Sequence, residues 1–93
     1  MALPTHPKRN SSTAFRKVGD EGGLVVIPGR SEVKVLNPVG IAVYGLLDGS
    51  HSIDEIVRTV IDEFEVEPTQ AREDVLAFLN DLAGHGMLVG FEA

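Results

Sequence analysis

Residues 24–49, LVVIPGRSEVKVLNPVGIAVYGLLDG, decide the fold, because a β pattern gives way to a helical one within them. Leu24–Ile27 is apolar and rich in β-branched residues, which is typical of a strand. Glu32–Val35 alternates polar and apolar side chains, which predicts a half-buried strand whose apolar face is Val33 and Val35. The Pro-Gly pair between the two segments favours a type II turn, so the segments are expected to form a hairpin.

Three helices are expected after the hairpin. Asn37-Pro38 is an N-cap followed by a proline at the first helical position, and this helix is expected to run to about Leu47. Ser52–Glu55 has the spacing of a capping box, which marks the start of a second helix. Pro68 is expected in the first turn of a third helix, which runs to about Ala83, just before two closely spaced glycines.

The two ends of the chain are less regular. Ala14–Val18 is a weaker strand candidate, and the proline- and serine-containing residues 1–13 are expected to be a flexible segment before the domain, which spans 14–90. The apolar residues 87–89 are expected to pack back as a short strand. We therefore predict an α+β domain, in which a three-stranded antiparallel sheet is followed by three helices in a winged helix-turn-helix-like arrangement.

Composition limits the classes of function. The chain has 93 residues and a net charge of −6, which fits one small domain and argues against a nucleic-acid partner. Its charge is uneven, since residues 1–19 carry four bases and no acid whereas residues 50–93 carry ten acids and two bases. The absence of cysteine excludes disulfides and thiol nucleophiles. Because the apolar runs are too short to span a bilayer and no secretory signal is evident, we expect a cytoplasmic protein that does not bind membranes.

No motif for catalysis, metal binding or cofactor binding stands out. His6, His51 and His85 are not at metal-ligand spacing with one another or with carboxylates. The hydroxyl and carboxylate groups near His51 are sequence neighbours, which rarely form a catalytic triad, and Ser52 is already explained as a helix cap. No glycine-rich segment has the Lys-Ser/Thr pair of a phosphate loop. We therefore expect no enzyme activity, no metal and no cofactor.

The third helix is expected to expose an apolar shoulder. Projected at 100° per residue, its core stripe consists of Ala71, Val75, Phe78 and Leu82. Asp74 and Asp81 lie on one flank, which is expected to be solvated. The opposite flank, which we call the shoulder, carries Arg72, Leu76, Leu79, Asn80 and Ala83. Two interpretations of Leu76 stay open: it covers the edge of a neighbouring helix or the C-terminal tail, or it forms one wall of a hydrophobic groove.

A peptide-binding groove is predicted beside this shoulder. If the strands pair in chain order, Glu32–Leu36 is an edge strand, whose unpaired backbone groups can accept an extended peptide. The side chains of such a peptide are expected to pack on the shoulder, as one wall of the groove. Lys34 also has a simpler role, because a charge on an edge strand discourages indiscriminate pairing.

Several motifs occur in a fixed order: LNPVGIAVYGLLDG at 36–49, SIDEIV at 52–57, DVLAFLNDL at 74–82 and GML at 86–88. In order and spacing they resemble the PqqD family, the pyrroloquinoline quinone (PQQ) biosynthesis protein D-like proteins. The fold of this family is also called the precursor-peptide recognition element of RiPPs, the ribosomally synthesised and post-translationally modified peptides. Tyr44 stands where many members have tryptophan.

The resemblance implies a non-catalytic adaptor, a peptide chaperone that binds the leader of a ribosomal precursor peptide. The leader would add as a strand to the third β-strand and pack against the third helix. The adaptor would present it to a modifying enzyme, commonly a radical SAM protein. The peptide-binding residues expected on these elements are Glu32, Val33, Lys34, Val35, Leu36, Arg72, Val75, Leu76, Leu79, Asn80 and Ala83.

A winged-helix module that binds a protein partner, or DNA, is the alternative. A DNA-reading helix should present Arg, Lys, Asn or Gln to base edges and phosphates. The third helix offers Gln70, Arg72 and Asn80 but also three acids. This charge balance favours a peptide or protein partner over DNA.

Overall fold

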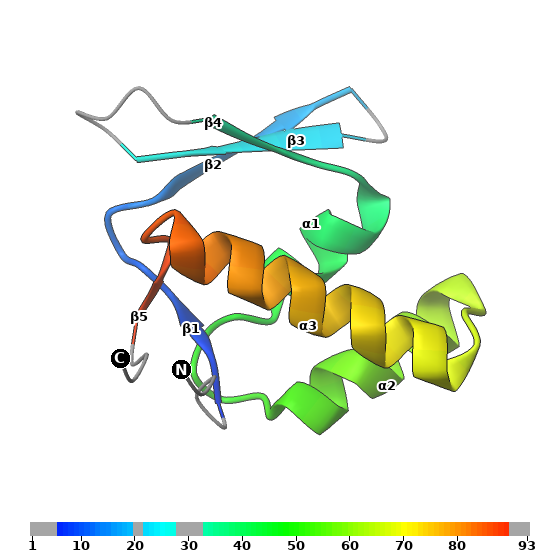
Figure 1. Ribbon diagram of the computed structural model, residues 1–93. Coiled ribbons are helices and arrows are strands. Elements are labelled where there is room, and N and C mark those ends of the chain that lie inside the picture. The colour runs from blue at the N-terminus through cyan, green and yellow to red at the C-terminus, as the bar shows by residue number, and fades with distance from the viewer. Residues whose placement is uncertain (1–5, 20–21, 28–32, 90–93) are drawn as a thin grey trace.

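The computed structural model describes residues 6–19, 22–27 and 33–89, which form a sheet packed on a layer of helices (Figure 1). The elements are β1 (Lys8–Arg9), β2 (Ala14–Val18), β3 (Gly22–Val26), β4 (Val33–Leu36), α1 (Pro38–Gly45), α2 (Ile53–Phe64), α3 (Pro68–Gly84) and β5 (Leu88–Val89). The sheet formed by β2, β3 and β4 is antiparallel and is followed by the three helices. The predicted α+β fold class is confirmed.

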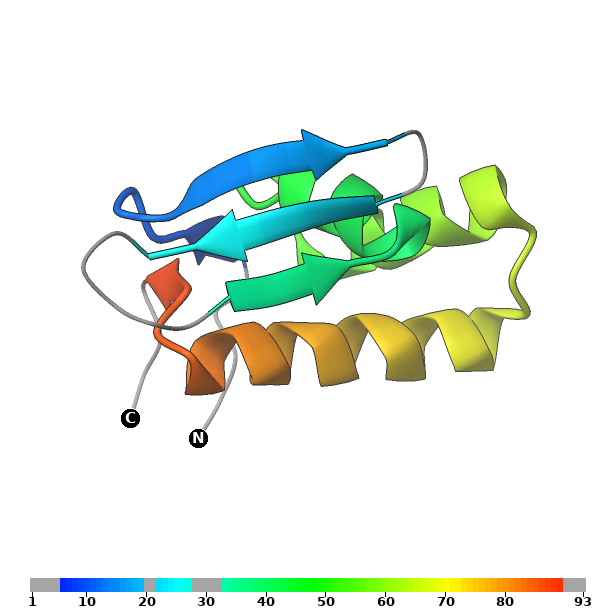
Figure 2. The ribbon, with the colours of Figure 1, turned by 90° about the horizontal axis from the view of Figure 1, so that it is seen from above.

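The three-stranded sheet has the order β2-β3-β4, so β2 and β4 are its two edges. Phe15 lies opposite Val25, and Val25 lies opposite Lys34. The predicted pairing in chain order and the edge position of β4 are confirmed. The predicted turn at 28–31 and Glu32 lie outside the described residues. Figure 2 shows α3 running beside β4, on the side away from β2.

The face that β4 turns toward the helices differs from the prediction. Val33 and Val35 are 57% and 72% exposed, whereas Leu36 is 2% exposed. Lys34 lies in register with the fully buried Val25, so Lys34 and Leu36 share the helix-facing side. A shift of one residue reverses every side chain of a strand. Leu36, which directly precedes the α1 cap Asn37, is the β4 residue that the core buries, and the alternation of the strand then leaves Val33 and Val35 facing solvent.

The helices begin where the sequence predicts. The Asn37 side chain accepts a hydrogen bond from the Gly40 amide at 2.8 Å, which caps α1. At α2 the predicted capping box is present: the Ser52 amide donates to the Glu55 carboxylate at 2.7 Å, and the Glu55 amide donates to the Ser52 hydroxyl at 3.1 Å. Pro68 occupies the first turn of α3.

One apolar core lies between the sheet and the helices. Its buried residues are Val25, Ile27, Leu36, Val43, Tyr44, Leu47, Ile56, Val57, Val60, Ala71, Val75, Leu79, Leu82, Met87 and Leu88. Leu47, expected at the end of the first helix, follows the end of α1 at Gly45 and is fully buried. Each fully buried aliphatic side chain of this kind contributes about 1.5–3 kcal/mol, so the core is the main source of stability.

Residues 8–10, within the segment that we predicted to be flexible at 1–13, pair with the rest of the fold, and residues 1–5 of that segment lie outside the described residues. In its described part, β1 pairs antiparallel with β5, which confirms the predicted strand after α3. The Arg9 amide donates to the Leu47 carbonyl at 2.7 Å, and the Asn10 amide donates to the Met87 carbonyl at 2.8 Å. These contacts are made by the backbone, which a composition poor in apolar side chains does not reveal.

Candidate functional site

A groove begins between the edge strand β4 and helix α3 and continues between α1 and α3, past the point where β4 leads into α1. It consists of two hollows of about 480 Å³ and about 330 Å³, which share Asn37 and Phe78 in their walls. The first is lined by Gly22, Lys34, Val35, Leu36, Asn37 and Phe78, and the second by Asn37, Val39, Gly40, Val43, Asp74, Val75 and Phe78. We call these residues, together with Asp81, the β4–α3 groove.

The ring of Phe78 lines both hollows and lies beside Gly40 in the first turn of α1. A Cβ atom at Gly40 would lie 3.5 Å from Phe78 Cε1, which is ordinary contact, and 3.3 Å from the Asn37 Oδ1 atom, which is tight. The glycine therefore mainly accommodates the Asn37 cap. Phe78 remains half-buried, so part of its ring is available to a ligand in the groove.

Charged groups stand along the groove. Lys34 of β4 forms an ion pair with Asp81 of α3, which joins the strand to the helix across the first hollow. Asp74 lies at the second hollow and accepts a hydrogen bond from the Gln70 side chain at 2.8 Å. One lysine and two aspartates give these three side chains a formal charge of −1 when all are ionised.

The shoulder of α3 does not face β4 as predicted. Arg72 forms an ion pair with Asp54, which places this side of the helix against α2. Leu79 is fully buried and Val75 is 1% exposed. Asn80 is exposed, whereas Leu76 and Ala83 are half-buried. Among the predicted site residues, the groove is lined by Lys34, Val35, Leu36 and Val75.

The opposite flank of α3 faces the groove instead. Asp74, Phe78 and Asp81 are spaced four and three residues apart and therefore share one face of the helix. We expected Phe78 in the core and the two aspartates in solvent, but Phe78 and Asp74 line hollows and Asp81 binds Lys34. Ala71, Val75 and Leu82 of the predicted stripe are buried, Leu79 is buried in addition, and Phe78 packs against the core but stays half-buried. The signal that could have found this face is the pair of acids flanking an aromatic residue, opposite a basic residue on the edge strand.

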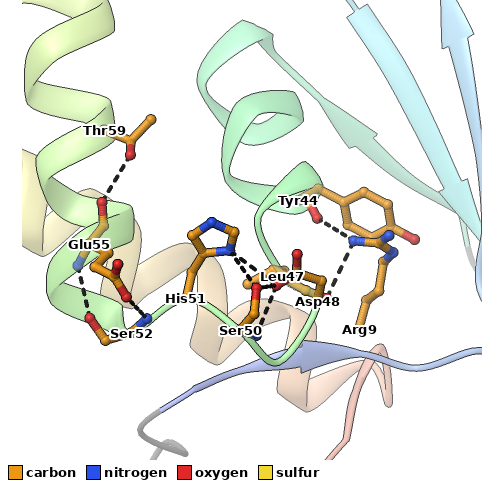
Figure 3. Close-up of polar contacts among 9 residues, drawn as sticks. All are labelled: Arg9, Tyr44, Leu47, Asp48, Ser50, His51, Ser52, Glu55 and Thr59. Carbon is orange, nitrogen blue, oxygen red and sulfur yellow. Dashed lines mark hydrogen bonds and ion pairs between the residues drawn. The ribbon is translucent and has the colours of Figure 1, made fainter.

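The loop between α1 and α2 carries the polar cluster shown in Figure 3. Asp48 accepts hydrogen bonds from the Ser50 hydroxyl at 2.7 Å and the Ser50 amide at 2.9 Å, and its Oδ1 atom lies 3.0 Å from His51 Nδ1. These hydrogen bonds, chiefly those from Ser50, hold the pKa of Asp48 well below its usual range.

The cluster does not have the geometry of a nucleophilic triad. Ser50 and Asp48 both contact the same nitrogen of His51, at 3.2 Å and 3.0 Å. A triad requires the hydroxyl on one ring nitrogen and the carboxylate on the other. The cluster therefore shapes the loop that leads to Ser52. At this start of α2, hydrogen bonds from Ser52 lower the pKa of Glu55, and the one from the Ser52 backbone amide has the largest effect.

Arg9 binds the carbonyl groups at the C-terminal end of α1, as Figure 3 also shows. Its guanidinium donates to the carbonyls of Tyr44 at 3.1 Å and Leu47 at 3.3 Å, and it lies 5.4 Å from the centre of the Tyr44 ring. A positive charge at the C-terminal end of a helix is stabilising because it complements the helix dipole. Arg9 therefore has a structural role that the sequence pattern did not indicate.

Within residues 6–19, 22–27 and 33–89, no three histidine or carboxylate side chains stand close enough together to hold a metal ion. In the same part of the chain, no helix is both long and apolar enough to cross a membrane. The β4–α3 groove joins the edge strand β4 to a hollow walled by Phe78.

Three solved structures share this fold. TbiB1 in complex with the TbiA(beta) leader peptide has 22% identity and a TM-score of 0.79, over 92% of this chain and 99% of that chain. Lasso peptide synthetase B1 complexed with its leader peptide has 23% identity and a TM-score of 0.77, over 90% and 98% of the two chains. The third is the solution NMR structure of the PqqD truncation of Methylobacterium extorquens PqqCD, described as a functional and stand-alone RiPP recognition element. It has 21% identity and a TM-score of 0.73, over 94% of each chain.

A family model makes the assignment more specific than the fold. No curated protein matches the chain significantly. The model described as coenzyme PQQ synthesis protein D (PqqD) matches residues 22–88, more than two thirds of the chain. This range contains β3, β4, all three helices and the whole β4–α3 groove, so the chain belongs to the PqqD family.

Proposed function

We propose that this chain is a non-catalytic adaptor that binds the leader of a ribosomally made precursor peptide in the β4–α3 groove. The observation that carries the proposal is the position of the edge strand β4 directly beside a hollow walled by Phe78. An added strand gains backbone hydrogen bonds from β4, and its alternate side chains point toward the groove. Two of the solved structures with this fold hold leader peptides, which supports the same use of the groove here.

The helical wall of this site is the face of α3 that carries Asp74, Phe78 and Asp81, and not the shoulder that the sequence predicted. Phe78 offers a half-buried ring as an apolar anchor, as aromatic residues commonly do at interfaces. Leu79 and Val75 support this wall from the core, because both are buried. The ion pair between Lys34 and Asp81 crosses the groove, so a bound peptide passes over it or replaces it.

The adaptor would deliver the bound peptide to a modifying enzyme, for which a radical SAM protein is the partner that the family favours. A small domain with a preformed groove suits this task, since it fixes one end of the peptide and raises the effective concentration of the rest at the enzyme. The chain needs no catalytic group of its own for this role. We expect the encounter to take place in the cytoplasm, where ribosomal peptides are made.

A titration of the isotope-labelled protein with the leader of a precursor peptide encoded near its gene tests the proposal. We expect amide shifts on residues 33–36 and on the α3 face around Phe78, with small shifts at Asn80 on the exposed face. Shifts confined to the shoulder, around Leu76, would restore the binding face that the sequence predicted. Addition of the leader without any shift on β4 or α3 would exclude the proposed function for that peptide.

Proline substitutions along β4 provide the backbone test. Adjacent residues of an edge strand direct their amides to opposite sides, so one phase bonds β3 and the other faces outward. Proline at Val33, Lys34 and Val35 in turn should separate the two effects. Proline at a residue whose amide faces outward should abolish leader binding with a small loss of stability. Proline at a residue whose amide bonds β3 should destabilise the sheet. Leader affinity that survives every folded proline variant would contradict strand addition.

A further inference from the structure

The second edge of the sheet, β2, carries its own cleft. About 320 Å³ of open space lies between β2 and α1, and it is lined by Arg9, Thr13, Phe15, Ile41, Tyr44 and Gly45. Phe15 stacks on Tyr44 with ring centroids 5.6 Å apart, and the Tyr44 hydroxyl lies 2.7 Å from the Thr13 hydroxyl. The cleft walls are therefore mainly aromatic and aliphatic carbon.

Strand β2 itself is open to a partner. All five of its residues, Ala14–Val18, are exposed. It has β3 on one side, and within the described residues no strand pairs with its other side. Phe15 points toward α1, so Lys17 shares this inner face while Arg16 lies on the outer face. An incoming strand would thus meet an aromatic residue and then two bases in succession.

Charge distinguishes this edge from the β4 edge. Residues 6–19 contain four bases, Lys8, Arg9, Arg16 and Lys17, and no acid. Helix α1, which lies beneath β2, contains no charged residue. At the opposite edge, Lys34 is already paired with Asp81. The β2 edge is thus a basic strand above a mainly apolar cleft, and the charged residue in the lining of that cleft, Arg9, is a base as well.

We infer that β2 is a second strand-addition site, which binds an extended acidic segment of a partner protein. Because side chains on adjacent strands pair directly, the register defines the sequence of the segment. An apolar residue lies beside Phe15 and enters the cleft, and two successive acidic residues lie beside Arg16 and Lys17 on opposite faces. The segment therefore reads apolar-acidic-acidic in a parallel arrangement, or the reverse in an antiparallel one.

A second copy of this chain fits the same edge less well. Two β2 strands paired through this edge would bring two Arg16 and two Lys17 side chains to one seam, where like charges repel. An acidic strand instead places opposite charges at these positions. The inference does not depend on leader binding, because it concerns the edge of the sheet farthest from α3 (Figure 2).

Two designed peptides test the inference. The probe is a capped eight-residue peptide in which one phenylalanine has two glutamates on each side, so that it presents the motif in either direction, in a threonine and valine background. The control peptide has lysines in place of the glutamates. In a low-salt NMR titration we expect the probe to shift the amides of Ala14–Val18 and Tyr44 but not those of Val33–Leu36. The lysine peptide should bind about tenfold more weakly, since two favourable cross-strand pairs become unfavourable.

Charge reversal makes the test specific. Arg16→Glu combined with Lys17→Glu should reverse the preference of the two peptides, and both side chains are exposed, so folding should be unaffected. Arg58→Glu, at an exposed base on α2, is the matched control for Arg16→Glu and should leave the preference unchanged.

Three results would overturn the inference. Equal affinity for the two peptides would exclude charge recognition at this edge. Shifts of β4 in place of β2 would show that the probe uses the leader groove. Shifts of β2 that depend on protein concentration without any peptide would assign the edge to a second copy of the chain.

Discussion

The two edges of one small sheet differ because different helices lie beneath them. The β4 edge stands beside α3, whose Asp81 neutralises Lys34 and whose Asp74 lines the adjoining hollow. The β2 edge stands above α1, which carries no charge, so the bases Arg16 and Lys17 determine its character. The charge of the first edge is thus set by the helix and that of the second by the strand. This difference lets one domain of 93 residues offer two unlike surfaces for extended chains.

The largest effect is expected where β4 meets the core. Leu36→Ala should lower the free energy of unfolding by about 2–5 kcal/mol, because the side chain is nearly fully buried. Val35→Ala, one residue away on the exposed face, should change it by less than about 0.5 kcal/mol. Urea unfolding of both variants measures the contrast. Equal losses would mean that the strand is turned over, with its valines in the core as the sequence pattern suggested.

The next effect concerns the wall of the leader groove. Phe78→Ala should weaken leader binding on the order of tenfold, because an anchor ring is lost from the groove. Leu76→Ala is the matched control, since Leu76 is also half-buried on α3 but lies on the other flank. Calorimetric titration of the two variants with one leader compares them. A larger loss of affinity in the Leu76 variant would place the peptide on the shoulder.

A smaller effect is expected at the ion pair that distinguishes the β4 edge. Asp81→Asn should change stability by less than about 1 kcal/mol, because the pair is partly exposed to solvent. The substitution should also leave the charge of Lys34 uncompensated. A leader with acidic residues near β4 should therefore bind the Asp81→Asn variant more tightly than the natural chain. Asp62→Asn, at an exposed acid on α2, controls for the change in net charge. If both variants change leader affinity alike, net charge rather than the position of Asp81 controls binding.

The sequence predicted the elements well because they depend on local chemistry. The caps at Asn37 and Ser52 and the proline at the start of α3 require only neighbours in the chain. Which face an element buries depends on its partners, and there the pattern was less reliable. In β4 the alternation was right but its phase was not. In α3 the core takes Leu79 in addition to the predicted stripe, and Phe78 packs against the core but stays half-buried. Both differences concern the groove, since β4 and Phe78 line it.

The sequence pattern could not predict the contacts of the N-terminal segment, for a different reason. Arg9 joins residues about 35 positions away in the chain, through backbone groups and the end of α1. Hydrogen bonds of this kind leave no periodic signature in the sequence, because any residue with an amide can donate them. These hydrogen bonds hold β1 in place, and β2 follows β1 in the chain. The position of the β2 edge therefore depends partly on contacts that cannot be predicted from the sequence pattern.

The smallest effect is expected from acid, at the loop that supports this second edge. Asp48 lies across from Lys8 of β1 and has a pKa lowered chiefly by its hydrogen bonds from Ser50. The pKa of Asp48 is lower in the folded than in the unfolded chain. Its carboxylate therefore contributes its full stabilisation above the pKa of the unfolded chain, near pH 4, and this contribution is lost as the pH falls through the pKa of the folded chain. Asp48→Asn should therefore lower Tm slightly at pH 7, and the difference should narrow progressively below about pH 4.

Scans of Tm against pH for this variant and for Asp62→Asn, an exposed acid on α2, check the assignment. Only the Asp48 variant should converge with the natural chain in acid. If its deficit is the same at pH 7 and at pH 2, the asparagine disturbs the turn by its shape rather than by loss of the carboxylate. In that case the loop, and with it the anchoring of β1 beneath the β2 edge, depends on geometry and not on the charge of Asp48.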